Sequence, residues 1–147
     1  MQLLAVGSAM ALLMEVLSHA GATVRIETVH VLRGETSATV SGRIGGYDSA
    51  QYIIGAGAGQ AVAVRLSPQS EACALRVWTP GADDPEFIDA RSGNDYVARD
   101  ARPAIYTAQI HLTRGGARRG ETCAYDLTFE LIDGADVLAK AKERGRL

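Results

Sequence analysis

An arginine-rich segment carries the side chains best suited to binding an anionic partner. Arg114, Arg118 and Arg119 lie within six positions, and no Asp or Glu interrupts them. The glycines of this segment leave the backbone free to protrude or to take positive φ. A guanidinium group pairs bidentately with a carboxylate or a phosphate. The segment therefore predicts either a protruding loop that enters an acidic cleft or an ordinary solvated hairpin tip.

A short polar connection is the second candidate for a binding site. It runs over residues 46–52 and carries Tyr47 and Asp48 at its turn and Tyr52 at its end. Tyr is favoured at protein interfaces because its side chain is rigid and amphipathic. We expect Tyr52 to lie in the core. Tyr47 has two interpretations, a contact with a partner or a cover over the edge of a sheet.

Catalytic and metal-binding patterns are missing from the sequence. After residue 20 the chain has His30 and His111, whose spacing is not that of metal ligands. The glycine-rich run Gly55–Gly59 precedes a strand pattern and not a helix pattern, so it predicts a hairpin turn and not a dinucleotide site. Asp83 and Asp84 lie in a loop with Pro and Gly, where acids are usually solvated. We expect no catalytic residues, no metal, no cofactor and no enzymatic activity.

The composition indicates one globular domain. The chain has 147 residues, of which 47% are hydrophobic and 22% charged. Its net charge of −2 gives no overall attraction to nucleic acid, so a nucleic-acid partner is not expected. No later segment resembles a membrane span.

The first twenty residues differ from the rest and indicate a secretory signal peptide. Residues 1–17 contain no Lys or Arg and a single acid, Glu15, within an apolar run. Small residues at Ser18 and Ala20 suit cleavage after residue 20. The alternative is a buried N-terminal helix, although no amphipathic face is visible. The prediction is export, with residues 1–20 removed.

The rest of the chain alternates apolar and polar residues with a period of two. Cys73, Leu75 and Val77 share one parity, opposite Arg76 and Trp78. Such strands have one buried and one solvated face, as in antiparallel sheets. About eight short strands separated by turn residues predict an all-β fold, an antiparallel β-sandwich over residues 21–133. The strands expected, two of them weak, are 23–32, 38–44, 51–56, 61–66, 73–78, 87–90, 96–98, 105–112 and 125–131. Residues 134–147 are expected to form an exposed C-terminal tail, helical over 135–144.

The two cysteines are predicted to form a disulfide. Cys73 and Cys123 fall on the inward parity of their strands and would enter an oxidising compartment. The bond would close a loop of about 50 residues, worth roughly 4 kcal/mol in the chain-entropy model. Two positions remain open, across the core or between neighbouring strands. The alternative is two buried thiols that pack as small hydrophobic groups.

Together these segments resemble the periplasmic inhibitors of g-type (goose-type) lysozyme. The resemblance covers roughly residues 24–132, almost the whole mature chain. Each motif alone is weak, but their order and spacing make the set specific. The motifs are the run 40–48 (VSGRIGGYD), Tyr52, Gly59–Gln60 before Val62–Val64, Arg114–Arg119, and Tyr125–Leu127.

The resemblance implies a β-sandwich that binds and inhibits a g-type lysozyme in the periplasm. Such lysozymes cut peptidoglycan with a Glu as general acid, within a cleft shaped for an extended glycan. The resemblance implies that Arg118 is the leading contact in this cleft and that Arg114 and Arg119 support it. Tyr47 is expected to pack on the rim of the cleft, with Asp48 beside it.

A protein of a different class shares part of this pattern. Carbohydrate- or substrate-binding accessory domains, of the kind found beside secreted peptidases, have a similar Gly–Gln turn and strand pattern. The arginine-rich segment and the Ser–Gly…Gly–Tyr run favour the inhibitor. An assay of lysozyme inhibition separates the two hypotheses.

Overall fold

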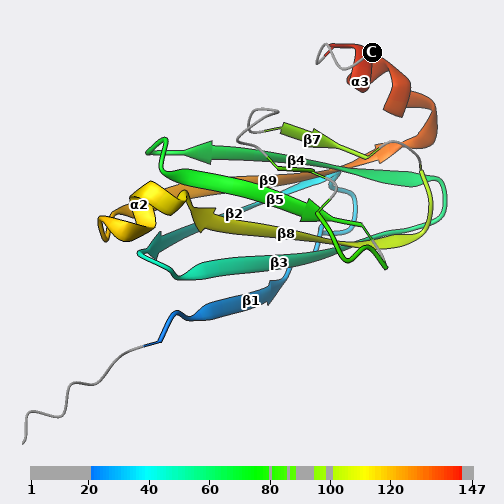
Figure 1. Cartoon of the computed structure of the whole chain (residues 1–147). Helices are drawn as coiled ribbons and strands as arrows, with labels where there is room; N and C mark the ends of the chain where they lie inside the picture. Colours follow the sequence, from blue (N-terminus) through cyan, green and yellow to red (C-terminus); the bar gives the residue numbers. More distant parts are fainter. Residues whose placement is uncertain (1–20, 80, 86, 89–94, 99–100, 144–147) are drawn as a thin grey trace, which may run out of the picture.

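Two β-sheets stacked face to face form the body of the protein (Figure 1). The computed structural model describes residues 21–79, 81–85, 87–88, 95–98 and 101–143. Sheet A has the strand order β1-β3-β8-β5-β6, and sheet B has the order β2-β9-β4-β7. The predicted all-β sandwich is confirmed, whereas the predicted signal peptide, residues 1–20, lies outside the described residues. The strands are β1 Val24–Thr28, β2 Ser37–Gly45, β3 Ser49–Ala56, β4 Gln60–Pro68, β5 Cys73–Trp78, β6 Phe87–Ile88, β7 Asp95–Val97, β8 Ala104–Leu112 and β9 Thr122–Asp133.

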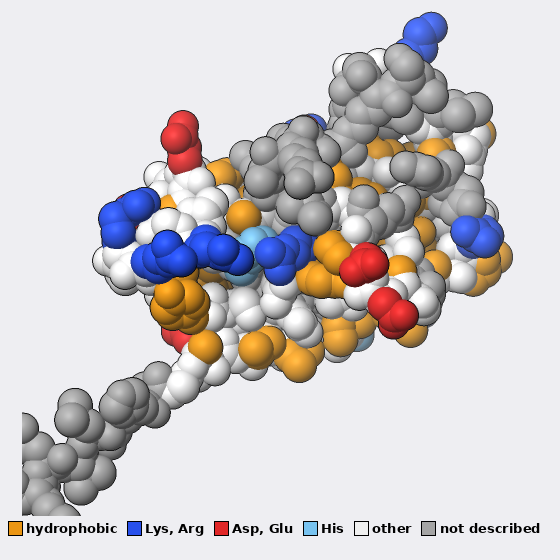
Figure 2. All heavy atoms as spheres, in the orientation of Figure 1, with side chains coloured by type: hydrophobic (Ala, Val, Ile, Leu, Met, Phe, Trp, Pro, Cys, Tyr) orange, Lys and Arg blue, Asp and Glu red, His pale blue; other side chains and the backbone are white. Residues whose placement is uncertain are grey.

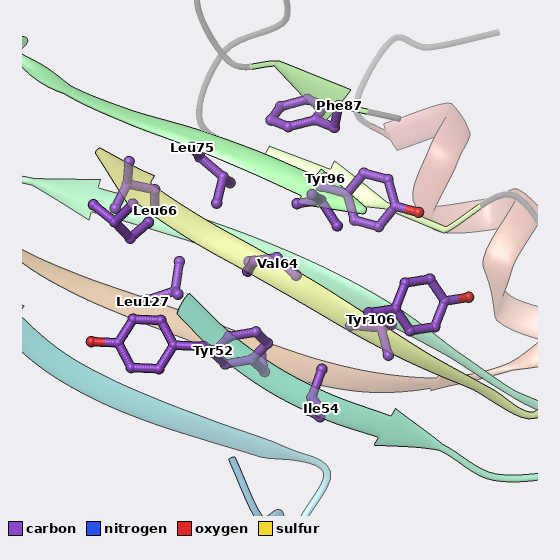
Figure 3. Packing of buried hydrophobic residues seen from close by; sticks show 14 of the residues in the cluster. Tyr52, Ile54, Val64, Leu66, Leu75, Phe87, Tyr96, Tyr106 and Leu127 are labelled. Carbon is purple, nitrogen blue, oxygen red and sulfur yellow. The ribbon is translucent and has the colours of Figure 1, made fainter. Parts of the chain in front are cut away.

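The core lies between the sheets and contains the side chains of one parity from each strand. On β9, Leu127 and Phe129 are fully buried, whereas Asp126 between Tyr125 and Leu127 is exposed. Figure 3 shows buried side chains from both sheets, among them Tyr52 and Val64. The period of two in the sequence therefore reports burial directly, because successive side chains of a strand point to opposite faces. Tyr52 is completely buried, as expected.

Consecutive strands mostly pass from one sheet to the other. β3 belongs to sheet A and β4 to sheet B, so the turn within Gly55–Gly59 links the two sheets and is not the predicted hairpin turn. The chain reverses there because Gly59 adopts a φ of +73° and the Gln60 N–H donates to the Gly57 carbonyl oxygen at 3.1 Å. Turn residues mark where a chain reverses, but which strands then pair depends on the packing of the whole sandwich.

The first strand lies at an edge of sheet A and ties the two sheets together. β1 pairs with β3 in parallel, which departs from the antiparallel arrangement predicted. Arg25 donates to the hydroxyl oxygens of Tyr52 at 3.0 Å and Tyr125 at 3.2 Å, and these two hydroxyls are 2.7 Å apart. Gly42 makes room for this cluster, because a Cβ there would overlap the Tyr125 hydroxyl. The glycine of the Ser–Gly motif thus has a packing reason.

A disulfide joins the sheets at the end of the sandwich where β5 and β9 begin. Cys73 is the first residue of β5 in sheet A, and Cys123 is the second residue of β9 in sheet B. Their Cα atoms are 5.9 Å apart, and 50 positions separate them in the sequence. The predicted disulfide is confirmed, and it crosses the core. By closing so long a loop it disfavours the unfolded chain by roughly 4 kcal/mol.

Two weak strands and the C-terminal helix complete the described part. The predicted strands 87–90 and 96–98 are found as β6 and β7, which lie in different sheets, and the residues between them fall outside the described ranges. A single 3-10 turn, η1 (Gly134–Asp136), leads into the helix α3 (Val137–Glu143). Val137 is buried against the core, whereas Lys142 is exposed. The tail is therefore attached to the sandwich through its first helical residue.

Candidate functional site

The arginine-rich segment forms a short helix at one end of the sandwich (Figure 1). This helix, α2, spans Arg114–Arg118 and joins β8 of sheet A to β9 of sheet B. The Thr113 hydroxyl caps it by accepting a hydrogen bond from the Gly116 N–H at 3.2 Å. Gly116 and Ala117 are buried. The two predicted conformations, a protruding loop and a hairpin tip, are both wrong, because the cap and the buried small residues fold the segment back onto the sandwich.

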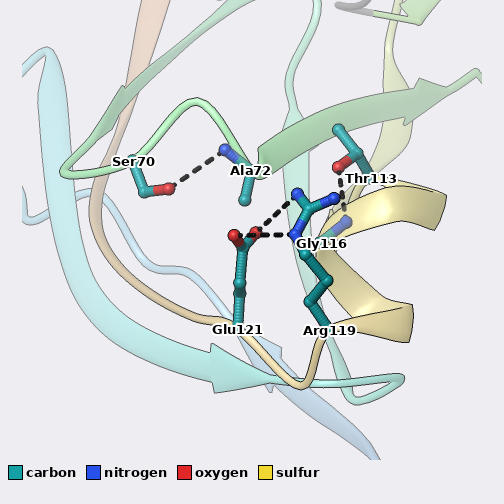
Figure 4. A network of polar contacts seen from close by, with 6 residues as sticks. All are labelled: Ser70, Ala72, Thr113, Gly116, Arg119 and Glu121. Atoms are coloured by element: carbon teal, nitrogen blue, oxygen red, sulfur yellow. Dashed lines mark hydrogen bonds and ion pairs between the residues drawn. The ribbon is translucent and has the colours of Figure 1, made fainter.

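Glycine is needed at position 116 because α2 lies very close to the body of the protein. A Cβ at Gly116 would lie 2.7 Å from Glu121 Oε2 and 3.0 Å from the Cβ of Ala72. The Thr113 N–H also donates to the Ala72 carbonyl oxygen at 2.7 Å, which fixes the start of the helix. Figure 4 shows these residues together. Glycine is therefore needed at position 116 because there is no room for a side chain, and its conformational freedom is not the reason.

Arg119 is held by an acid of its own chain. Its Nε and Nη2 atoms donate to the two carboxylate oxygens of Glu121, at 3.2 and 3.3 Å (Figure 4). The guanidinium group also lies over Gly115, where a Cβ would be 3.2 Å from Arg119 Nη1. This bidentate pair closes the turn after α2 and engages the Nε–Nη2 edge of the guanidinium group.

Arg114 and Arg118 are the two arginines of the segment that remain available. Both side chains are exposed. Within the described ranges, neither makes a hydrogen bond or an ion pair. Figure 2 shows Lys and Arg side chains gathered over α2. The site therefore presents two guanidinium groups from a rigid base, and no acid of the described residues neutralises either of them.

The tyrosine turn lies beside the end of the α2 segment. The Gly46 N–H donates to the Glu121 carbonyl oxygen at 2.9 Å, next to the pairing of Gly45 with Thr122. Tyr47, at the tip of this turn, is 66% exposed, although it is a large aromatic residue. Two predicted parts of the site, far apart in the sequence, are thus brought together by the β2–β9 pairing. Tyr47 is free to contact a partner.

Asp48, which is expected among the lysozyme-binding residues, makes hydrogen bonds within its own chain. Its Oδ1 atom accepts hydrogen bonds from the Thr23 N–H at 2.8 Å and the Thr23 hydroxyl at 3.0 Å. These bonds favour the carboxylate and lower the pKa of Asp48 below its usual value. Asp48 therefore anchors the residues that lead into β1. Through these bonds Asp48 holds the tyrosine turn against Thr23.

Sequence reasoning missed two residues that build the site, Thr113 and Glu121. A signal for the first was present, because Thr directly before a helix is a common N-cap. Glu121 gave no such signal. Its side chain meets Arg119 only because the chain turns at Gly120, which has a φ of +64°. Its carbonyl oxygen meets Gly46 only because β2 and β9 pair.

The described residues contain neither a metal-binding cluster nor a membrane-spanning helix. Among them, no group of three or more His, Cys, Asp and Glu side chains could hold a metal ion. No helix within the described ranges is both long and apolar enough to cross a membrane.

This sandwich, with its α2 segment beside the tyrosine turn, is similar to solved structures of one class of protein. PliG of Aeromonas hydrophila, a periplasmic inhibitor of g-type lysozyme, superposes with a TM-score of 0.67 at 25% identity, over 76% of this chain and 100% of its own. A mutant of Escherichia coli PliG has a TM-score of 0.56 at 27% identity, over 76% of this chain and 100% of its own. Salmonella Typhimurium PliG has a TM-score of 0.56 at 26% identity, over 74% and 98%.

The resemblance to the g-type lysozyme inhibitors is confirmed by these structures. All three are named as periplasmic inhibitors of g-type lysozyme, and this chain spans almost their whole length. No protein-family model matches the chain, and no curated protein matches it in sequence. The sequence identities are low, so the role of each side chain must be argued from the site.

Proposed function

We propose that this protein is a periplasmic inhibitor of g-type lysozyme that blocks the enzyme's cleft with the exposed arginines of α2. The observation that carries the proposal is that Arg114 and Arg118 are exposed, have no partner among the described residues, and lie on a helix whose buried side packs against the sandwich. The similarity to PliG supplies the kind of partner. The signal-like residues 1–20 support export to the same compartment.

The chemistry of the cleft suits a guanidinium group. A glycosidase keeps carboxyl groups around the bond that it cleaves, including the general acid. A guanidinium that enters such a cleft forms a bidentate, charge-assisted pair with a carboxylate while the body of the inhibitor excludes the glycan. Rigidity adds affinity, because a side chain on a fixed helix loses less freedom on binding than one on a flexible loop.

The structure of the site changes the roles that we propose for its residues. Arg118 remains the leading contact, and Arg114 supports it. Arg119 positions the segment through Glu121. Tyr47 packs on the rim of the cleft, and Asp48 acts indirectly by holding the tyrosine turn.

A turbidity assay of lysozyme action on peptidoglycan tests the proposal. The mature chain should inhibit g-type lysozyme and leave a c-type enzyme largely unaffected, because specificity is a difference of affinities. Replacement of Arg118 by Ala should weaken inhibition by roughly 30-fold, since a desolvated interface Arg is worth at least about 2 kcal/mol. Arg118→Lys should restore only part of this, because an ammonium group lacks the fork geometry.

Arg33 provides the matched control. It is an exposed arginine in the connection between β1 and β2, and the described residues give it no ion-pair partner. Arg33→Ala removes the same charge at the other end of β2 and should inhibit like the wild type. Both variants should keep the wild-type melting temperature. A mature chain that binds glycan and inhibits no g-type lysozyme would instead be an accessory domain.

A further inference from the structure

The proposed site is too small to account for a stable complex by itself. Residues 113–121 and the turn 46–48 comprise twelve residues. A stable interface buries about 800 Å² on each partner and involves roughly 20–30 residues. The contact with a lysozyme must therefore extend from α2 over an adjoining surface. The outward faces of sheet A and sheet B are the two extended surfaces that we compare for this role.

Polar side chains on the outward face of sheet B hydrogen-bond to one another. The Ser41 hydroxyl donates to Asp126 at 2.6 Å, and the Thr39 and Thr128 hydroxyls are 2.9 Å apart. Its cations are also engaged. Arg43 donates to the Thr122 hydroxyl at 3.2 Å, and Arg65 pairs with Asp95 at 3.0 Å. Acidic side chains on this face would repel the acidic surroundings of a glycosidase cleft.

The outward face of sheet A has a different composition. No Asp or Glu is present among its described residues on β1, β3, β5 and β8, and Arg76 is its one charged residue. Side chains alternate along each strand, so the register identifies this face. Its residues are Val24, Ile26, Thr28, Ser49, Gln51, Ile53, Gly55, Ala74, Arg76, Trp78, Ile105, Thr107, Gln109 and His111.

Arg76 has no hydrogen-bond or ion-pair partner among the described residues. It lies between Gln109 of β8 and Ile88 of β6 in the register. Its Nε atom is buried and makes no hydrogen bond, and the same is true of the neighbouring His111 Nδ1 atom. Trp78 lies two residues further along β5 on the same face and is partly exposed. Arg and Trp are the residue types most enriched among the dominant contacts of protein interfaces.

The row of cations is continuous with α2. Figure 2 shows Lys and Arg side chains that extend from α2, past a histidine, onto the adjoining strands. Arg76 is opposite Gln109 in the register, and His111 lies two residues further along β8 on the same face, near the end of β8 that leads into α2. Hydrophobic side chains border this row.

We infer that the lysozyme-binding surface continues from α2 onto the outward face of sheet A, where Arg76 and Trp78 contact the carboxylate-bearing surface beside the cleft. This inference rests on the proposed function, and it names residues and a direction that the proposed function leaves open. The outward face of sheet A is chosen over that of sheet B because its described residues include a guanidinium without a described partner and an aromatic residue, and they include no acid. Arg76 would thereby gain a carboxylate partner that the described residues do not provide.

Paired variants with equal loss of charge test the inference. Arg76→Met keeps the apolar stem and removes the charge from sheet A, and Arg65→Met does the same on sheet B. The dissociation constant for a g-type lysozyme should rise about 10-fold for Arg76→Met and less than about 3-fold for Arg65→Met. Equal effects of the two variants would indicate only a general attraction and would overturn the inference.

Trp78 provides a second measurement that does not depend on a substitution. It is the only tryptophan of the chain, so incorporation of fluorotryptophan gives the inhibitor a single fluorine NMR resonance even beside unlabelled lysozyme. The resonance should shift and lose solvent accessibility on binding. An unchanged resonance in a complex that still needs Arg118 would reject this surface but leave the proposed function intact. Failure of the wild type to bind any g-type lysozyme would reject the proposed function itself.

Discussion

The outward faces of the two sheets differ in whether their polar groups have partners within the protein. On sheet B, hydroxyl, carboxylate and guanidinium groups bind one another across neighbouring strands, from Ser41–Asp126 to Arg65–Asp95. On the outward face of sheet A and on α2, the described residues give Arg76, Arg114 and Arg118 no acid partner, and two buried nitrogen atoms, Arg76 Nε and His111 Nδ1, make no hydrogen bond. A face whose polar side chains hydrogen-bond to one another contributes solubility and a little folding stability. A face with buried polar groups that lack hydrogen-bond partners lowers folding stability, and a bound partner can restore it by supplying those hydrogen bonds.

The sharpest way to test the rigid base of α2 is to fill its closest contact. Gly116→Ala should destabilise the protein by about 1–3 kcal/mol, because the added Cβ must displace both Glu121 and Ala72. Ala is the better helix former by about 1 kcal/mol, but Ala72 is fixed by the backbone and does not move aside as a flexible side chain would. Denaturant unfolding measures the change, and inhibition should fall with it.

Gly55 is the matched control for this substitution. It lies on the outward face of sheet A with nothing within 4 Å of an added Cβ. Gly55→Ala should leave stability unchanged or raise it by a few tenths of a kcal/mol, since Ala restricts the unfolded chain. Equal destabilisation by both substitutions would mean that α2 is not closely packed.

The pH dependence of folding stability tests whether His111, on the outward face of sheet A, is buried without a partner. Burial, followed by the charge of Arg76, lowers the pKa of His111 from 6.5 to about 4. Between these two values the unfolded chain binds a proton that the folded chain does not, so stability falls as the pH drops from about 6.5 to about 4. The loss should be on the order of 1–2 kcal/mol, because one pKa unit corresponds to about 1.4 kcal/mol and partial exposure of the imidazole reduces the effect.

His111→Gln isolates this contribution from that of the carboxylates. The variant should lack the part of the acid-induced loss that is due to His111, and thermal unfolding at several pH values measures the difference. Identical pH profiles for the variant and the wild type would show that the His111 environment is satisfied in solution.

The smallest effect is expected on sheet B. Ser41→Ala removes an exposed hydrogen bond to Asp126 and should cost less than about 1 kcal/mol. Inhibition of g-type lysozyme should not change. A clear loss of inhibition with normal stability would move the partner surface from sheet A to sheet B.

The sequence by itself determined the strands, the inward parity of the cysteines and the kind of side chain that the site offers. These features are local, because the period of two is set by the geometry of a single strand. The same reasoning took the turn at 57–59 for a hairpin turn and residues 114–120 for a loop or a hairpin tip. In both cases the local signal, a run of glycines, was correctly read as a reversal or a special conformation, but its partner lay elsewhere in the chain.

Only the tertiary structure decided which of the candidate residues act together. The β2–β9 pairing placed Tyr47 beside α2. Glu121 pairs with Arg119, whereas Arg114 and Arg118 have no acid partner among the described residues. Asp48 was likewise assigned to Thr23. The physical reason is that the chemical type of a side chain is set by its own residue. Whether that side chain is free to bind a partner depends on contacts between residues far apart in the sequence.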